Sequence, residues 1–343
     1  MKRILCGLIL AVLSCSTADP SLVTPPNGVG GQGGTLGMTA GTAGLWTLPQ
    51  AGLMLNLPPE GGQAGQDGGT KPIEIITELP DGFVQANVGG YRLGGSLETG
   101  QAGAASVPDD DCANVITGVS RDFRSDRPAN HPDFEVFAGR TVSNGLVQPN
   151  LGDDQKPVYT GICEVGAMPA CQNGPQTTSK ANFDQWYRGA EGANHSYLVQ
   201  IWLAPQPSGL FTFESLFYYP LDGAGFKDSA LADDQKQHNF GFTTEIHTQF
   251  LYQGGEVFQF KGDDDVWIFI NQKLAVDLGG LHHAQAATIQ LDAAAPQLRI
   301  ETGKVYNLDL FHAERHTNQS TFRIDSNLSF VNCGTVVPEP PPR

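Results

Sequence analysis

Short runs that alternate apolar and polar residues, separated by turn residues, dominate the chain between Cys112 and Cys333. Such runs predict β-strands, whereas long amphipathic helical patterns are scarce and residues 183–192 are the best short helical candidate. We therefore expect a mainly β fold, an antiparallel β-sandwich or barrel with one or two short helices. The expected strands lie within residues 113–123, 196–204, 210–219, 243–252, 256–260, 266–270, 273–278, 287–292, 304–311 and 321–331.

One stretch, residues 256–283, is more informative than the rest. Residues 266–270 (Val-Trp-Ile-Phe-Ile) are apolar on both alternating faces, so this strand is expected to be covered on both sides. Three consecutive aspartates, Asp263–Asp265, come directly before it, and a third strand ends at Asp277 before a Gly-Gly pair. An acidic turn is thus predicted at the edge of a rigid hairpin.

Two interpretations of Asp263, Asp264 and Asp265 stay open. Aspartate is common in turns because its side chain bonds nearby backbone amides, and the turn is then merely solvated. Three adjacent carboxylates, however, repel one another, and a cation relieves that repulsion. Because carboxylate oxygens are the ligands that calcium prefers, the third aspartate favours a cation site, and with it a binding module before an enzyme.

Composition narrows the classes of partner. The chain has 343 residues, enough for one large domain or two small ones, with 20 basic and 36 acidic residues and a net charge of −16. This acidic balance argues against nucleic acid and against anionic membrane surfaces as partners. It suits a secreted protein that attracts cations.

The first residues have the pattern of an export signal. Lys2 and Arg3, followed by the apolar run Ile4–Leu13, predict a signal peptide over residues 1–15 that is too short to span a bilayer. The segment before Cys15 is similar to a lipoprotein cleavage site, so we expect a lipid anchor on Cys15, with ordinary signal cleavage as the alternative. The protein is therefore expected at the cell surface as an outer-membrane lipoprotein, or secreted, with membrane contact only through that anchor.

The composition also predicts how the chain is divided. Residues 16–72 are rich in Gly and Pro and poor in bulky side chains, which predicts a disordered, flexible tether. Residues 73–111 carry strand-like pieces and are expected to form a lead-in segment. Residues 112–333 are the expected β domain, and residues 334–343 form a Pro-rich tail.

Four cysteines lie in the part expected to be exported, where an oxidising environment predicts two disulfides with three possible pairings. Cys163 and Cys171 are eight positions apart around a Gly/Pro loop, and Cys112 and Cys333 bracket the domain. We predict the pairs Cys163–Cys171 and Cys112–Cys333. A zinc site is the alternative, although the close cysteine pairs of a zinc knuckle are missing.

Six segments and one cysteine carry a resemblance to a known family. In chain order they are VSRDF (119–123), HPDFE (131–135), FDQWYRG (183–189), HNFGFTTEIHTQF (238–250), GDDDVWIFINQKLAVDLGGLHH (262–283), LFHAERHTNQSTFRI (310–324) and the closing Cys333. On these segments the chain resembles the fibro-slime domain family of secreted bacterial and slime-mould proteins. That family is in turn similar to the protective-antigen-type β-barrel of yeast flocculins and epithelial adhesins.

The resemblance implies that β-barrel fold and, in its lectin members, a Ca²⁺ ion held by an Asp-Asp dipeptide with a cis peptide bond. The dipeptide maps onto Asp263 and Asp264, with Asp265 as an addition. The lectin members also use an asparagine from a later loop, for which Asn318 is the nearest candidate. The expected calcium ligands are therefore Asp263, Asp264, Asp265 and Asn318.

A group of histidines competes for a function. On an extended strand His312, Glu314 and His316 share one face, and His282 follows the Gly-Gly pair. The run HAERH is not the zinc-protease HExxH, which needs Glu directly after the first His on a helix. Three interpretations stay open: sugar contacts, a transition metal, or a buried network of His312, Glu314 and Arg315 with Asp277 or Asp309.

Aromatic residues complete the candidate site. Trp267 and Trp202 are expected in the core, whereas Trp186 and Tyr187 lie near a loop and are candidates to stack on a sugar. The expected ligand-binding residues are Asp277, His282, His312, Glu314, Arg315 and Trp186.

The function expected from these observations is a calcium-dependent binding module that recognises carbohydrate or a matrix component in adhesion. No enzyme is expected, because no Gly-x-Ser-x-Gly elbow is present and 36 acidic residues do not single out a glycosidase pair. The first alternative is a purely structural extracellular-matrix protein without sugar binding. A weaker alternative is a metal-dependent hydrolase built on His312, Glu314 and His316.

Overall fold

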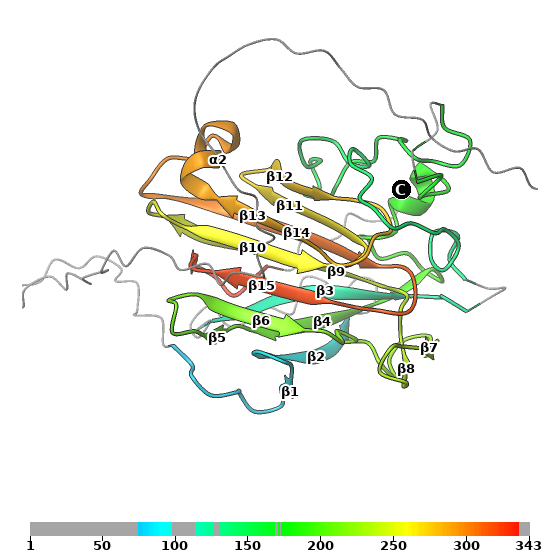
Figure 1. The fold of residues 1–343 in the computed structure, drawn as a ribbon, viewed down its shortest axis with the longest axis horizontal. Coiled ribbons are helices and arrows are strands. Elements are labelled where there is room, and N and C mark those ends of the chain that lie inside the picture. Colours follow the sequence, from blue (N-terminus) through cyan, green and yellow to red (C-terminus); the bar gives the residue numbers. More distant parts are fainter. Residues whose placement is uncertain (1–74, 98–113, 127–129, 169–170, 172, 336–343) are drawn as a thin grey trace, which may run out of the picture. The chain divides into compact units, whose positions relative to one another are not determined.

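The computed structural model describes residues 75–97, 114–126, 130–168, 171 and 173–335. These residues form two main β-sheets that pack face to face, with all their named strands paired antiparallel (Figure 1). The predicted mainly β, antiparallel sandwich fold with two short helices is confirmed. Within the described residues, no helix has the length and apolar character needed to cross a membrane.

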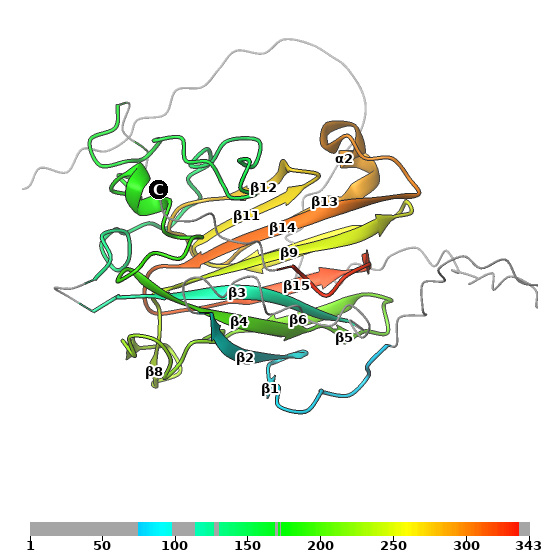
Figure 2. The same cartoon turned by 180° about the vertical axis from the view of Figure 1, so that it is seen from behind.

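The larger sheet has nine strands and faces the viewer in Figure 2. Its order is β1 (Val84–Gln85), β2 (Gly90–Leu97), β4 (Asn194–Trp202), β3 (Val115–Phe123), β9 (Phe242–Tyr252), β14 (Lys304–Glu314), β11 (Asp265–Ile270) and β12 (Lys273–Leu278), with β16 (Ser329–Phe330) paired to β9.

The smaller sheet faces the viewer in Figure 1. Its order is β13 (Gln285–Gln290), β10 (Val257–Gly262), β15 (Phe322–Ser326), β6 (Phe211–Ser215) and β5 (Ala204–Pro205). A separate hairpin consists of β7 (Ala230–Leu231) and β8 (Gln237–His238), and the two helices are α1 (Lys180–Phe183) and α2 (Leu291–Leu298).

The main hydrophobic core lies between the sheets. Val266, Ile268 and Ile270 of β11 are fully buried there and share a core with Phe258 and Phe260 of β10. Because alternate residues of a strand point to opposite faces, these three residues account for one face of β11 only. Burial of the other face requires a second layer.

That second layer comes from the irregular segment before β4. Trp267 and Phe269 of β11 pack with Phe134, Phe183 and Trp186 in a second core on the other side of the large sheet. Both faces of β11 are therefore covered, as the unbroken apolar run predicted. Trp202 of β4 is also buried, so the expected core positions of both tryptophans are confirmed.

Two expectations about local structure were wrong. The helical candidate at 183–192 forms turns instead, because the Asn194 side chain donates hydrogen bonds to the carbonyls of Gln185 and Arg188, and α1 ends at Phe183. The expected strand at 287–292 stops at Gln290 and continues as α2, whose Leu291 and Leu298 are buried. The strand pattern gave no sign of this helix, which contains Pro296.

The lead-in segment is part of the sheet rather than a separate piece. β2 pairs with β4 from Gly90↔Trp202 to Leu97↔Ser196, so the folded domain reaches back at least to this strand. The expected boundary at residue 112 was too late, because β1 has only two residues and β2 is rich in glycine, so neither carries a clear alternation signal. The expected signal peptide, Cys15, the whole tether and the end of the Pro-rich tail lie outside the described residues.

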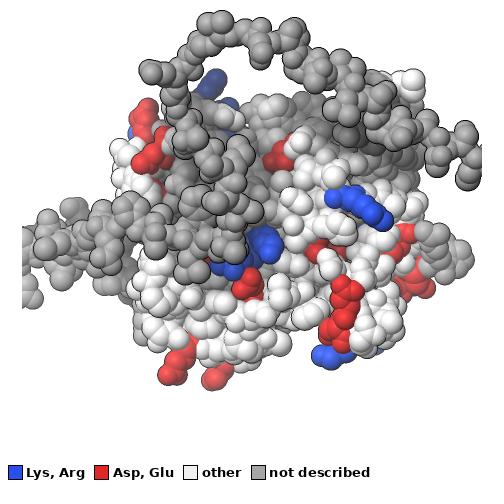
Figure 3. Space-filling model, viewed as in Figure 1, with Lys and Arg blue, Asp and Glu red and all other residues white. Residues whose placement is uncertain are grey.

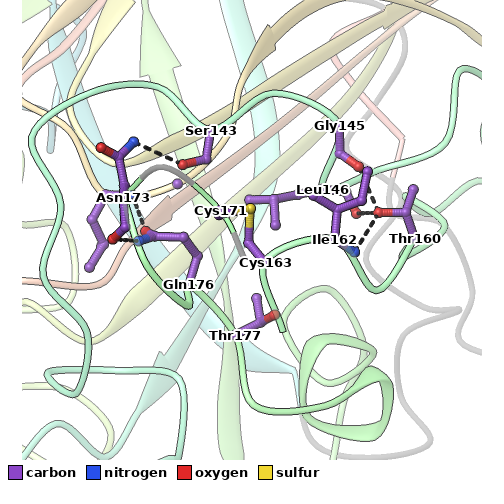
Figure 4. The surroundings of a disulfide bond; sticks show 12 residues. Ser143, Gly145, Leu146, Thr160, Ile162, Cys163, Cys171, Asn173, Gln176 and Thr177 are labelled. Carbon is purple, nitrogen blue, oxygen red and sulfur yellow. Dashed lines mark hydrogen bonds between the residues drawn. A yellow bond between two sulfur atoms is a disulfide. The ribbon is translucent and has the colours of Figure 1, made fainter. Parts of the chain in front are cut away.

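The local disulfide is present. Cys163 and Cys171 are bonded, with their Cα atoms 5.2 Å apart, and close a loop beside Gln176 and Asn173 (Figure 4). The prediction of this pair is confirmed, and these two cysteines are not zinc ligands. Cys333 is also disulfide-bonded. Cys112 lies outside the described residues, so its pairing with Cys333 stays a prediction.

Surface charge on the described residues agrees with the composition. On the face shown in Figure 3, acidic and basic side chains are scattered among uncharged ones, and the visible described surface carries no continuous basic patch.

Candidate functional site

Two connections cross between the sheets at the same end of the domain. β10 of the small sheet ends at Gly262 and β11 of the large sheet begins at Asp265, so the turn Asp263–Asp264 makes the first crossing. The second crossing is loop 315–321, from β14 to β15. Because β10 pairs with β15 and β11 pairs with β14, the acidic turn and this loop lie side by side.

The first two aspartates of the turn hold the two ends of the loop. Asp264 Oδ2 accepts a hydrogen bond from the Arg315 amide at 2.8 Å, and Asp263 Oδ1 accepts one from the Thr321 amide at 2.5 Å. Asp264 adopts a left-handed backbone conformation with φ 53°, and its amide donates to the His282 carbonyl at 3.2 Å. The turn therefore fixes where the loop begins and where it ends.

Asp265 has a different role from its two neighbours. Its Oδ2 accepts from Arg315 Nε at 2.6 Å and its Oδ1 accepts from the Gly280 amide at 2.5 Å, with both charged side chains fully buried. The Arg315 guanidinium also lies 4.5 Å over the Trp186 ring and donates to the carbonyl of Asp133. Both Asp265 oxygens are thus used by protein donors, which favours a structural role for Asp265 over the expected role as a metal ligand.

Glu314 and His312 point to the opposite face, between the sheets. Both are fully buried, and neither the Glu314 carboxylate nor the His312 ring makes a hydrogen bond of normal geometry. Asp263 Oδ2 and the Tyr219 hydroxyl are likewise buried without a partner. Several unpartnered polar atoms therefore gather behind the acidic turn, where burying each without a hydrogen bond is costly.

The electrostatics of this cluster follow from burial and like charge. Burial raises the pKa of Asp263 to about 6. Burial also raises the pKa of Asp264 well above its usual range, although Arg315 opposes this. The pKa of Glu314 is raised well above its usual range by burial first and then by Asp264 and Asp263, with Ser320 and the His316 amide only partly offsetting these effects. The negative charge of the three carboxylates is therefore compensated only in part, by Arg315 acting on Asp264.

Asn318 lies in the adjacent loop and is held by the β7–β8 hairpin. Its side-chain nitrogen donates to Asp233 Oδ1, and its carbonyl accepts from the Asp233 amide at 3.1 Å. Figures 1 and 2 show the hairpin at the same end of the two sheets as the β14–β15 connection. The implied cis bond at Asp263–Asp264 is absent, because the left-handed Asp264 makes that turn, and the cis bond among the described residues is Thr317–Asn318.

The histidine trio does not form. β14 ends at Glu314, so His316 leaves the strand and its Nδ1 pairs with the Thr317 carbonyl at 2.5 Å. Burial lowers the pKa of His312 to about 3, so this ring is neutral at physiological pH. His282 is buried, and its ring is bonded to the carbonyls of His283 and Leu278. The transition-metal interpretation of the trio loses its geometric basis.

The prediction that Asp277 or Asp309 bonds with His312, Glu314 and Arg315 was also wrong. Asp277 accepts hydrogen bonds from the Trp267 indole at 3.0 Å and from the Gly145 amide at 2.7 Å. Asp309 pairs with His247 at 2.6 Å. Both aspartates lie on the face of the large sheet away from Glu314, so they fix the second core and take no part in the cluster.

Trp186 was expected to stack on a sugar, but it is fully buried. Its indole donates to Asp133 Oδ2 at 3.1 Å, and its ring lies beneath Arg315 and beside Phe183. Tyr187 is buried as well. The correction has a simple cause, because the irregular segment that carries both rings covers the outer face of the large sheet.

Three residues near the site carried no sequence signal. Tyr219 stacks on His238 of the hairpin with ring centroids 4.0 Å apart, and its pKa is raised by burial, then by Glu314 and Asp263. Asp233 holds Asn318, and Glu135 accepts from the Thr317 amide at 2.7 Å. Each lies in an irregular segment, where neither period two nor period 3.6 marks which side chains turn inward.

The comparisons with known proteins concern this same part of the chain. Residues 192–340 match the PA14 domain. The match spans both sheet crossings, the hairpin and the carboxylate cluster. The chain is also 37% identical to protein psiD of Dictyostelium discoideum over 206 residues, which are 58% of this chain and 39% of that protein. It is 36% identical to protein psiC of the same organism over 228 residues, 64% of this chain and 42% of that protein.

The chain therefore spans less than half the length of these two relatives. The PA14 match agrees with the protective-antigen part of the resemblance and with the observed β-rich fold. Membership of the fibro-slime family stays a prediction. Among the described residues, no group of three His, Cys, Asp or Glu side chains is placed to hold a metal ion.

Proposed function

We propose that this chain is an extracellular binding module that takes up Ca²⁺ at the acidic turn and recognises carbohydrate or another matrix component there, in adhesion. PA14 domains are often carbohydrate-binding modules and occur in extracellular or cell-surface proteins, which supports the coarser part of the proposal. The calcium dependence rests on the residues of the turn.

One observation carries the calcium proposal. Asp263 and Asp264 are buried side by side where the chain crosses between the sheets, and Asp263 Oδ2 has no partner. Burial raises the pKa of both carboxyls, which means that their negative charge is poorly compensated by the protein. A hard cation with oxygen ligands would compensate it. Asp263 and Asp264 would hold the ion, with Asn318 from the adjacent loop.

The hydrogen bonds of the turn also explain how a bound cation would affect sugar binding. Asp264 and Asp263 bond the amides of Arg315 and Thr321, the first and last residues of the loop that carries Asn318. Fixing the two aspartates therefore fixes the loop. A bound Ca²⁺ would leave coordination positions for vicinal sugar hydroxyls, because calcium accepts six to eight oxygen ligands.

The other expectations from the sequence complete the proposal. Lipidation of Cys15, or secretion after signal cleavage, would place the module outside the cell, and residues 16–72 would act as a tether. We propose no catalytic activity, because the hydrolase alternative needed His316 beside His312 and Glu314, and His316 lies outside the strand.

A structural matrix protein without sugar binding is the second candidate. The hydrogen bonds from Arg315 and Thr321 to the two aspartates favour it, since they show that the acidic turn already orders the domain from within. On this alternative the turn needs no external ligand.

A glycan array separates the two. The protein is applied in Ca²⁺ and in excess EDTA, together with Asp264→Asn and with Asp153→Asn, an exposed aspartate that serves as the matched control. We expect a sugar signal that disappears in EDTA and in Asp264→Asn but survives in Asp153→Asn. Sugar binding that persists in EDTA contradicts the calcium mechanism, and no signal on any glycan favours the structural candidate.

A further inference from the structure

Glu314 is a fully buried acidic residue between the two sheets. It is the last residue of β14, and its side chain shares the inner face with His312, whose ring lies among Phe242, Phe260 and Phe322. Its exposed fraction is 0%, yet neither carboxylate oxygen accepts a hydrogen bond of normal geometry. A carboxylate in such a place costs several kcal/mol unless something outside the chain contacts it.

Other polar atoms near Glu314 are also buried without a hydrogen-bond partner. Asp263 Oδ2 and the Tyr219 hydroxyl are also buried and unpartnered. The strand register pairs Asp265 with Ala313, and the amide of Arg315 donates to Asp264 Oδ2 at 2.8 Å, so Glu314 lies on the strand beside the acidic turn. With the Glu314 carboxylate, Asp263 Oδ2 and the Tyr219 hydroxyl are unpartnered oxygens, which is the donor set of a hard cation, whereas the other unpartnered group on this face is the His312 ring.

No basic side chain compensates Glu314 from its own segment. The neighbouring Arg315 turns to the opposite face of the sheet, where it pairs with Asp265 and donates to the carbonyls of Asp133 and Gln176. This follows from strand alternation, because residues 314 and 315 point to opposite sides. Glu314 is therefore left without a basic partner from its own segment.

We propose that Glu314 is a third carboxylate ligand of the ion that Asp263 and Asp264 bind, reached from between the sheets. The inference rests on the proposed function, and it assigns the site to a hard divalent cation of the calcium class. As the side chains stand they do not yet converge on one point, so binding requires the carboxylates to rotate toward the ion. A third carboxylate raises the charge of the site, which is a main determinant of calcium affinity.

Calcium titration by isothermal calorimetry on the full chain tests this inference. The variants are Glu314→Gln, which keeps the shape and removes the charge, and Glu191→Gln, an exposed glutamate in a turn, as the matched control. We expect Glu314→Gln to weaken calcium binding roughly tenfold or more, because one of three charged ligands is lost. Glu191→Gln should bind calcium as the wild type does.

Melting temperatures in EDTA provide the second readout. If Glu314 is a ligand, it is an uncompensated charge in the cation-free protein, so Glu314→Gln should melt at the same temperature as the wild type or higher. A Glu314→Gln variant that melts lower or fails to fold in EDTA overturns the inference, since Glu314 would then be a structural hydrogen-bonding group.

The results also separate this inference from the proposed function. If the wild type binds calcium and Glu314→Gln binds it within about twofold of the wild type, Glu314 is not a ligand and the proposed function stands. If the wild type binds no calcium, both fail together. Weakened calcium binding with an unchanged or higher melting temperature in EDTA supports the inference.

Discussion

Neighbouring aspartates in the same turn should respond in opposite ways to the same substitution. Asp265 forms a fully buried ion pair with Arg315 at 2.6 Å. In Asp265→Asn the guanidinium would face an amide and remain as an uncompensated buried cation. Removing one partner of such a pair costs about 3–5 kcal/mol. Because Arg315 keeps its bonds to two carbonyls, we expect a loss near the lower limit, about 3 kcal/mol.

Asp263→Asn should not destabilise the cation-free protein. An asparagine can still accept the hydrogen bond from the Thr321 amide through its side-chain oxygen. Burial raises the pKa of Asp263 from 3.8 to about 6, so the ionised carboxylate, the main form at pH 7, is less stable in the folded protein than in the unfolded chain. At about 1.36 kcal/mol for each pH unit, this difference sets an upper limit of about 3 kcal/mol on the gain in stability.

The assay is urea unfolding at pH 7 in EDTA, followed by circular dichroism, with the free energy of unfolding extrapolated to zero urea. The two variants control for each other, since they share the residue type, the turn and the substitution. Equal losses in both variants, or a loss below about 1 kcal/mol in Asp265→Asn, would refute the assignment of Asp265 to structure and Asp263 to the ligand site.

Two further predictions concern stability. Burial alone would lower the pKa of His247, but Glu245 and Asp309 outweigh burial and raise it. Protonated His247 therefore stabilises the folded protein. This contribution is complete below the ordinary pKa of 6.5 and is lost as the pH rises through the folded-state pKa. We expect the free energy of unfolding to fall over that range and to change less in His247→Gln; an unchanged pH profile in this variant contradicts the assignment. Replacing Cys163 and Cys171 by serine reopens a loop closed over eight positions and should cost about 2.5 kcal/mol in urea unfolding, and no loss would show that the loop is held by its other contacts.

The strands were predictable because burial on one face leaves an alternating pattern and burial on both faces leaves a continuous apolar run. β9, β11 and β14 are long apolar or alternating runs, and each was expected within a few residues of its observed bounds. β2 and α2 were not predictable in the same way. β2 is a glycine-rich strand next to the edge strand β1, and α2 is a short helix with Pro296 inside, so neither carries a clear period.

The candidate site was only partly predictable. The acidic turn was found from its residues alone, but its three aspartates were treated alike. Strand alternation does separate them. Asp265 begins β11 and shares a face with Trp267. Its cross-strand partner is Ala313, and Arg315, two positions further on, continues that same face. The same rule turns Glu314 inward. Tyr219 was not predictable, because it follows β6 in an irregular segment and only the folded chain places it there.

Thermal unfolding of the protein with Ca²⁺ and with EDTA tests the central claim most directly, namely that the turn at Asp263 and Asp264 binds calcium. We predict a melting temperature that rises with calcium concentration, because an ion that binds only the folded state stabilises it. We predict no such rise in the double variant Asp263→Asn/Asp264→Asn. A wild-type melting temperature that is the same in calcium and in EDTA would contradict the claim, and the acidic turn would then serve internal order alone.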